Sequence, residues 1–200
     1  MKNAKIKSLA VLLTALSIAN FNTGWTNTGD RVKDAIDSVA KTLKKEVDKL
    51  GENKEAIQNY LNNYDWKGIV QDHASSDPVT LKHLKMNGQS KAVAVLPGEK
   101  IDCEVRCDLD REKCSAFSLY RVVMGIKGEG AQTTIGNELG IVAGESVERF
   151  SLHAPSQPGF YEVRFKVVKS LRENKAIESW KDDHGKEPKA STTVGIIFVK

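Results

Sequence analysis

The ten residues KIDCEVRCDL, at positions 100–109, alternate between charged and apolar side chains without a break. Because successive side chains of a β-strand point to opposite faces, a period of two predicts a half-buried strand. The apolar members, which we expect in a core, are Ile101, Cys103, Val105, Cys107 and Leu109. The charged members share the other face.

Segments with strand patterns lie on both sides of this stretch. They cover residues 79–88, 91–98, 118–126, 132–142, 146–154, 160–168 and 192–199. Glycine or Pro-Gly ends several of them, and both Pro97-Gly98 and Pro158-Gly159 have the pattern of type II turns. Seven or eight short strands in about 120 residues predict a mainly β fold, an antiparallel β-sandwich.

The segment GESVERFSLHAPSQPGFYEVRF, residues 144–165, resembles the E-strand, turn and F-strand region of immunoglobulin-like and fibronectin type III-like domains. It is most similar to small bacterial extracellular domains of that type. The resemblance implies an immunoglobulin-like sandwich over residues 79–200 and places Tyr161 at the tyrosine corner, where the hydroxyl bonds to upstream backbone. It implies an architecture and no activity.

Two departures from related folds are visible in the same region. Antibody-type domains have Tyr-x-Cys where this chain has Tyr161-Glu162-Val163, so the partner for an inter-sheet disulfide is missing. Blue-copper sandwiches need a cysteine and a histidine after this strand, and residues 164–200 contain His184 but no cysteine.

The first nineteen residues have the pattern of a secretory signal peptide. MKNAKIKS is positively charged, LAVLLTAL is a short apolar run, and Ser17 and Ala19 are small residues before a cleavage point. We therefore expect residues 1–19 to be removed and the protein to be exported, to the periplasm, the cell surface or the medium. The alternative is an N-terminal helix of a cytoplasmic protein. Since no later segment resembles a membrane span, we expect no stable membrane insertion after cleavage.

Residues 20–78 are expected to form a helical region with a linker. After the polar residues 20–29, a stripe with helical spacing consists of Val32, Ile36, Val39, Leu43, Val47 and Leu50. A weaker helix is expected over residues 53–64. This apolar stripe could pack on the β-domain, mediate self-association through residues 30–50, or lie on a membrane surface. We favour packing on the β-domain of the same chain.

The charge of the chain excludes a general attraction to nucleic acid. The formal net charge is +4, with 30 basic and 26 acidic residues. Residues 1–19 contribute three lysines and no acidic residue, so 27 basic residues remain after their removal. A nearly neutral protein has no electrostatic reason to bind nucleic acid.

The three cysteines fall in one short stretch, with C-x₃-C-x₆-C spacing that differs from zinc sites. Cys103 and Cys107 are about 13 Å apart on one strand face, too far to share a metal or a bond. We expect no metal site. In an exported protein we expect a Cys107–Cys114 disulfide beside a buried, structural Cys103, with Cys103–Cys114 as the competing pair. In a reducing cytosol all three stay thiols.

No catalytic or cofactor motif is present. His73, His83, His153 and His184 are scattered, and a cysteine nucleophile needs a positioned histidine base. The glycine-rich residues 125–140 lack a phosphate-binding pattern, and residues 108–112 lack the glycine and distant glutamate of a calcium loop. We therefore expect no cofactor and no enzyme.

The long polar connection SLRENKAIESWKDDHGKEPKAST, residues 170–192, is the candidate recognition segment. It exceeds the two to five residues of an ordinary hairpin loop. The candidate binding residues are Ile177, Trp180, Asp182, Asp183 and His184. The alternative is that Ile177 and Trp180 pack the loop onto the rim of the sandwich.

These features predict an exported, non-catalytic binding protein that recognises an unknown protein or glycan in an adhesion or envelope accessory role. The alternatives are an enzyme inhibitor that inserts this loop into a cleft, a secreted effector, and a hydrolase without a recognised motif.

Overall fold

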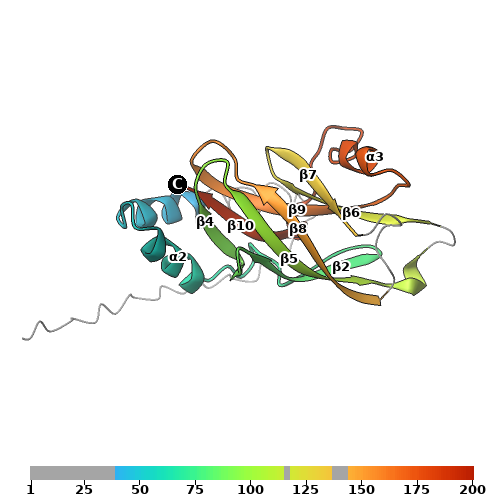
Figure 1. The fold of residues 1–200 in the computed structure, drawn as a ribbon, viewed down its shortest axis with the longest axis horizontal. Coiled ribbons are helices and arrows are strands. Elements are labelled where there is room, and N and C mark those ends of the chain that lie inside the picture. The colour runs from blue at the N-terminus through green and yellow to red at the C-terminus, as the bar shows by residue number, and fades with distance from the viewer. Residues whose placement is uncertain (1–38, 115–117, 137–143) are drawn as a thin grey trace, which may run out of the picture.

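The computed structural model describes residues 39–114, 118–136 and 144–200. It consists of two five-stranded sheets packed face to face, with helical segments outside them. Figure 1 shows the N-terminal helices and α3 near opposite ends of an elongated molecule. The expected signal peptide, the linker and the start of the first helix lie outside the described residues.

The first sheet is antiparallel throughout. It contains β1 (His73–Ser76), β2 (Val79–Met86), β3 (Gln89–Ser90), β5 (Lys100–Leu109) and β8 (Gly144–His153). The order is β1-β2-β5-β8, with β3 paired to β2. The strand that the alternating stretch predicted is confirmed with the expected bounds, and its apolar members are buried. Its ladder with β8 is continuous from Lys100–His153 to Leu109–Gly144.

The second sheet has the order β4-β10-β9-β6-β7. Its strands are β4 (Ala92–Val95), β6 (Tyr120–Ile126), β7 (Gly130–Ile135), β9 (Gly159–Lys169) and β10 (Thr193–Val199). The prediction of a purely antiparallel sandwich is wrong at one pair, because β4 and β10 run parallel. After β4 the chain returns to the other sheet as β5, so no hairpin joins β4 to its neighbour and fixes an antiparallel direction.

Each side of the second sheet is covered. Its inner face packs on the first sheet in a core that includes Val122, Met124, Val163, Phe165 and Ile197. On the outer face, residues 39–48 and α2 (Lys54–Asn63) cover β4 and β10, while α3 (Glu173–Glu178) covers β6. Every residue of β6 and β10 is therefore buried, although alternation predicted one buried face for residues 118–126.

The N-terminal helices belong to the same packed body as the sheets. Leu43 and Val47, two members of the predicted stripe, are 1% and 2% exposed and pack in one cluster with Ile196 and Phe198 of β10. The described part of the stripe thus packs intramolecularly, and self-association through residues 30–50 stays a prediction. Within the described ranges, no helix is long and apolar enough to cross a membrane.

Three local expectations have different outcomes. The Tyr161 hydroxyl donates to the Gln157 carbonyl at 2.8 Å, the bond that the resemblance implies. At Pro97-Gly98 the glycine has φ +70°, and the Glu99 N–H donates to the Leu96 carbonyl at 3.1 Å, as in a type II turn. The second type II prediction is wrong, because Gly159 is nearly extended at φ +159° and begins β9.

The four-residue strand β1 was not predicted. Its sequence HASS falls in the expected helical region, yet it pairs with β2 in register from His73–Lys82 to Ser76–Val79. The boundary expected at residue 78 therefore cuts through a β-hairpin.

Candidate functional site

The cysteines do not form the expected site. Cys103 and Cys107 are 4% and 0% exposed in the core, and burial raises the pKa of each thiol to about 12. The predicted Cys107–Cys114 disulfide is absent, since all three cysteines are free thiols. Strand β5 continues past Cys107 to Leu109, and the Cys114 thiol donates to the Asp110 carbonyl at 3.1 Å, beyond the end of the strand.

The segment of residues 170–192, here called the C-terminal loop, is fastened to the outer face of the second sheet. Trp180 is 3% exposed and packs with Ala176 of α3 against Val123 of β6. A Cβ added to Gly125 would lie 2.8 Å from the Trp180 ring, so this glycine makes room for it. Trp180 therefore fastens the loop, as in the packing alternative, and does not present an exposed ring to a ligand.

The predicted residue Asp182 organises the tip of the C-terminal loop. Its carboxylate accepts the N–H groups of His184 and Lys186 at 2.9 and 2.8 Å. The hydrogen bond from the Lys186 N–H is the main reason that the pKa of Asp182 is lowered. Asp183 and His184 are exposed on this turn. Three of the five predicted binding residues thus share the tip, while half-buried Ile177 lies in α3, away from it.

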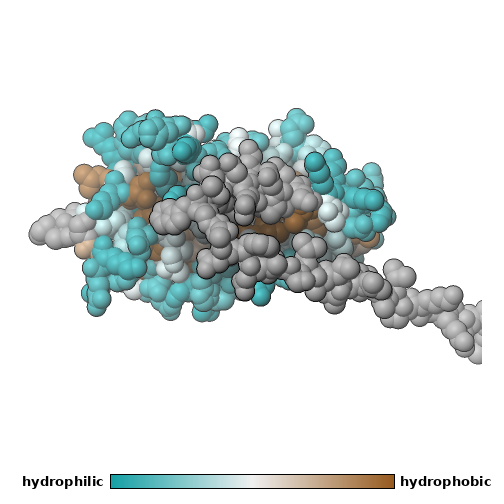
Figure 2. Space-filling model, turned by 180° about the vertical axis from the view of Figure 1, so that it is seen from behind, coloured by the Kyte–Doolittle hydropathy of each residue, from teal (hydrophilic) through white to brown (hydrophobic). Residues whose placement is uncertain are grey.

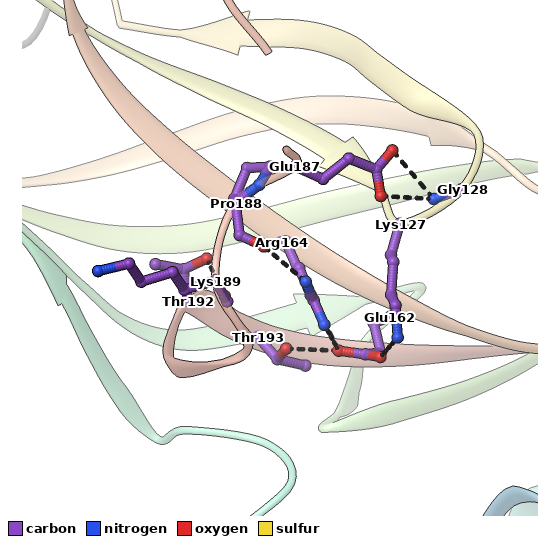
Figure 3. Close-up of polar contacts among 9 residues, drawn as sticks. All are labelled: Lys127, Gly128, Glu162, Arg164, Glu187, Pro188, Lys189, Thr192 and Thr193. Carbon is purple, nitrogen blue, oxygen red and sulfur yellow. Dashed lines mark hydrogen bonds and ion pairs between the residues drawn. The ribbon is translucent and has the colours of Figure 1, made fainter. Parts of the chain in front are cut away.

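The next residues tie the loop to the strands beneath it. The Glu187 carboxylate accepts the Gly128 N–H, from the turn between β6 and β7, at 3.0 and 3.2 Å. The neighbouring Pro188 carbonyl accepts from the Arg164 guanidinium, which comes from β9 (Figure 3). The loop is thus held by hydrogen bonds in addition to the packing of Trp180.

A group of polar residues under the loop, here called the polar cluster, consists of Lys127, Glu162, Arg164 and Thr193 (Figure 3). Glu162 accepts from Lys127 at 2.7 Å, from Thr193 at 2.8 Å, and from the Nη2 and Nε of Arg164 at 2.6 and 2.9 Å. The side chains of Glu162 and Arg164 are 5% and 8% exposed. This is a buried ion pair with its hydrogen bonds satisfied.

The charge state of Glu162 follows from these contacts. Burial opposes ionisation, but the hydrogen bond from Lys127 and the charge and hydrogen bonds of Arg164 outweigh it, so the net pKa is lowered. Sequence reasoning missed this cluster because Glu162 and Arg164 alternate with apolar residues in β9, as solvent-facing residues do. A long loop after β9 was the available sign that this face is covered.

A cleft of about 380 Å³ opens between the C-terminal loop and strand β1. Its lining includes residues with hydroxyl, amine and carboxylate groups and two aromatic residues. The lining residues are Ser75, Ser76, Phe165, Lys166, Trp180, Asp182, Lys186, Glu187, Pro188, Lys189, Ser191 and Thr192. One wall is thus a strand of the first sheet, and the other is the loop with η2 (Ala190–Thr192).

The cleft contains two carboxylates, those of Asp182 and Glu187, and both accept backbone N–H groups. Of the described residues, no histidine or cysteine is in its lining. Across the part of the chain that the structure describes, no three His, Cys, Asp or Glu residues form a metal-binding group.

Comparisons with known proteins give no assignment. No protein-family model matches the chain, and no curated protein is significantly similar to it.

Proposed function

We propose that this protein is an exported, non-catalytic binding protein that recognises a protein or glycan at the cleft beside the C-terminal loop. The proposal depends mainly on one observation: a long polar loop is held by the packing of Trp180 and by hydrogen bonds of Glu187 and Pro188, next to an open cleft. A surface ordered before binding loses less conformational entropy when a ligand arrives. Such ordering is expected of a recognition loop.

The lining of the cleft favours a hydrophilic ligand. Hydroxyl groups of Ser75, Ser76 and Ser191 lie with the amines of Lys186 and Lys189 around one space. Groups of this kind donate and accept hydrogen bonds with sugar hydroxyls or with peptide backbone. Where Figure 2 shows the described residues, the surface is also mainly hydrophilic, with hydrophobic residues in smaller areas between.

The strand order supports the immunoglobulin-like assignment as part of the proposal. Strands β2, β5 and β8 correspond to A, B and E of such a domain, and β6, β9 and β10 correspond to C, F and G. The cleft then lies at the edge of the sandwich, beside the connection between the last two strands. Connections of this kind are common recognition surfaces on a rigid scaffold.

The test is a binding screen with a matched pair of variants. The purified protein is applied to a glycan array and to extracellular protein fractions, and each captured ligand is titrated. Lys189→Glu reverses an exposed charge inside the cleft, and Lys181→Glu reverses an exposed charge outside its lining. We expect Lys189→Glu to weaken binding about tenfold, equivalent to about 1.4 kcal/mol, and Lys181→Glu to leave it unchanged.

Two outcomes contradict the proposal. If both variants lose the same binding affinity, the ligand does not bind at the cleft. Turnover of a substrate by the purified protein, with no ligand retained in any screen, would show an enzyme instead.

The exposed turn at the loop tip favours a second candidate, an inhibitor that inserts this turn into an enzyme cleft. Asp183 and His184 project from a turn whose backbone Asp182 fixes. Replacing both exposed residues by alanine then abolishes inhibition of the target enzyme, whereas Lys189→Glu does not. If instead Lys189→Glu abolishes the activity and the double alanine variant keeps it, the functional surface is the cleft.

A further inference from the structure

Two histidines from neighbouring strands lie together on the surface of the first sheet. His73 begins β1, and His83 lies in β2. Their ring centroids are 5.2 Å apart, and the ring planes are nearly perpendicular, at 89°. Both residues are exposed. The sequence had placed them in unrelated segments.

An irregularity in β2 creates this arrangement. The pairing of β2 with β5 shifts register between Lys82 and Lys85, and His83 within the shift has φ +54°. Leu81, two positions before His83, is buried, so regular alternation would direct residue 83 into the core as well. Bulges of this kind re-aim side chains and are frequent beside functional sites. Here the bulge turns His83 outward, next to His73.

We propose that His73 and His83 form an open binding site for a divalent transition metal ion of the zinc, nickel or copper type. Imidazole is a preferred ligand of these ions. Two imidazoles that share a tetrahedral zinc ion, with Zn–N distances of about 2.0–2.1 Å, have ring centroids roughly 5 Å apart. The observed separation of 5.2 Å matches that requirement.

The charged groups around the pair have both signs. Lys82, opposite His73, is paired with Asp108 and Glu145 at 3.0 and 2.9 Å. The Lys91 amine is 3.2 Å from the carboxylate of Asp72, which lines a hollow of about 150 Å³ with His83. His83 also lines a second hollow with Lys85, Arg106 and Glu104, and the Glu104 carboxylate is paired with Arg149 at 2.8 Å.

The site is open because the protein supplies two of the ligands and leaves the other coordination positions of the ion free. Among the described residues no third His, Cys, Asp or Glu joins the pair in a metal-binding group, so water or a group from another molecule completes the coordination. Because the ion would join β1 to β2, binding also resists separation of β1 from the sheet. Metal binding therefore stabilises the folded state.

The experiment is calorimetric titration of the purified protein with NiCl₂ and, separately, with ZnCl₂. Wild type is expected to bind one ion, and His73→Ala and His83→Asn are expected to reduce the affinity at least tenfold. Asparagine is chosen because it tolerates the positive φ of residue 83. His153→Ala, His184→Ala and Cys114→Ser are controls that should bind like wild type.

Thermal unfolding with and without the ion provides a second measurement. The wild-type midpoint rises with metal at pH 7.5, because the ion binds the folded state, and the midpoints of His73→Ala and His83→Asn do not. The proposal is overturned if wild type binds neither ion, if the control variants lose binding equally, or if both histidine variants retain it.

Discussion

Replacing Glu162 by glutamine tests whether the polar cluster is a buried ion pair that holds the C-terminal loop. The carboxylate accepts hydrogen bonds from Lys127, Arg164 and Thr193 at 2.6–2.9 Å. Glutamine keeps the size of the side chain and one acceptor oxygen but removes the charge. Arg164, only 8% exposed, then loses the negative charge that pairs with it, while the Pro188 carbonyl still accepts its hydrogen bond.

The magnitude follows from burial. Breaking a buried ion pair by removing one partner costs about 3–5 kcal/mol, because the other charge stays uncompensated. Lys127 is 30% exposed, so its amine can be solvated when the carboxylate is removed. Lys127 therefore adds little to the loss of unfolding free energy. We therefore expect Glu162→Gln to reduce the free energy of unfolding by about 3 kcal/mol, the lower end of that range.

The assay is urea unfolding of wild type, Glu162→Gln, Arg164→Met and the double variant. Each single variant leaves a buried charge or polar group without its partner, while the double variant removes both. The loss in the double variant is therefore expected to be smaller than the sum of the single losses by at least about 1 kcal/mol. Two results would refute a buried ion pair. One is a decrease in unfolding free energy below about 1 kcal/mol for Glu162→Gln, and the other is a decrease in the double variant equal to the sum of the two single decreases.

Three further predictions concern pH, packing and thiol reactivity. The pKa of Glu162 is lowered in the folded state, so its stabilisation is complete above the unfolded value of 4.5, and the stability difference between wild type and Glu162→Gln should shrink as pH falls below it. Gly125→Ala should cost more stability in urea unfolding than Gly195→Ala, beyond the roughly 1–3 kcal/mol usual for overpacking. A new methyl at position 125 clashes with the Gly130 carbonyl oxygen, which is fixed in the backbone. At position 195 the nearest contact is the flexible Met86 methyl at 2.7 Å, and equal losses of stability in the two variants would contradict this reasoning. Cys103 and Cys107, with pKa values of about 12, should resist a thiol reagent at pH 8 in the native protein and react in urea; modification of all three cysteines without urea would show that the core is open.

A strand was most predictable where strict alternation marks one face that meets water. In residues 100–109 the charged side chains mark the outer face, and both the bounds and the buried set were correct. Alternation carries less information for β6 and β10, because helical segments cover their outer faces as well. A continuous apolar strand shows that both faces are buried but does not say which segment covers them. The short strand β1 had no pattern to find, since only one of its four residues is fully buried.

The candidate site was harder to predict for a related reason. A tryptophan in a long polar loop is equally compatible with an exposed anchor and with a packed one, and the difference depends on the strand beneath it. Gly125 was the relevant residue, since only a strand position without a side chain leaves room for the Trp180 ring. Nothing in the local sequence of the loop connects these two residues, which are 55 positions apart.

The length of the C-terminal loop is explained by the outer face of β9. Glu162, Arg164 and Lys166 alternate there, between the apolar cluster under α2 and the apolar cluster under α3. A hairpin of two to five residues could not cross this face, whereas residues 170–192 supply backbone carbonyls to Arg164 and to Lys166. Much of the loop is thus required for covering charged groups. Under the proposed function, recognition would fall to the exposed turn at Asp183 and to the rim of the cleft, and variants there test binding separately from stability.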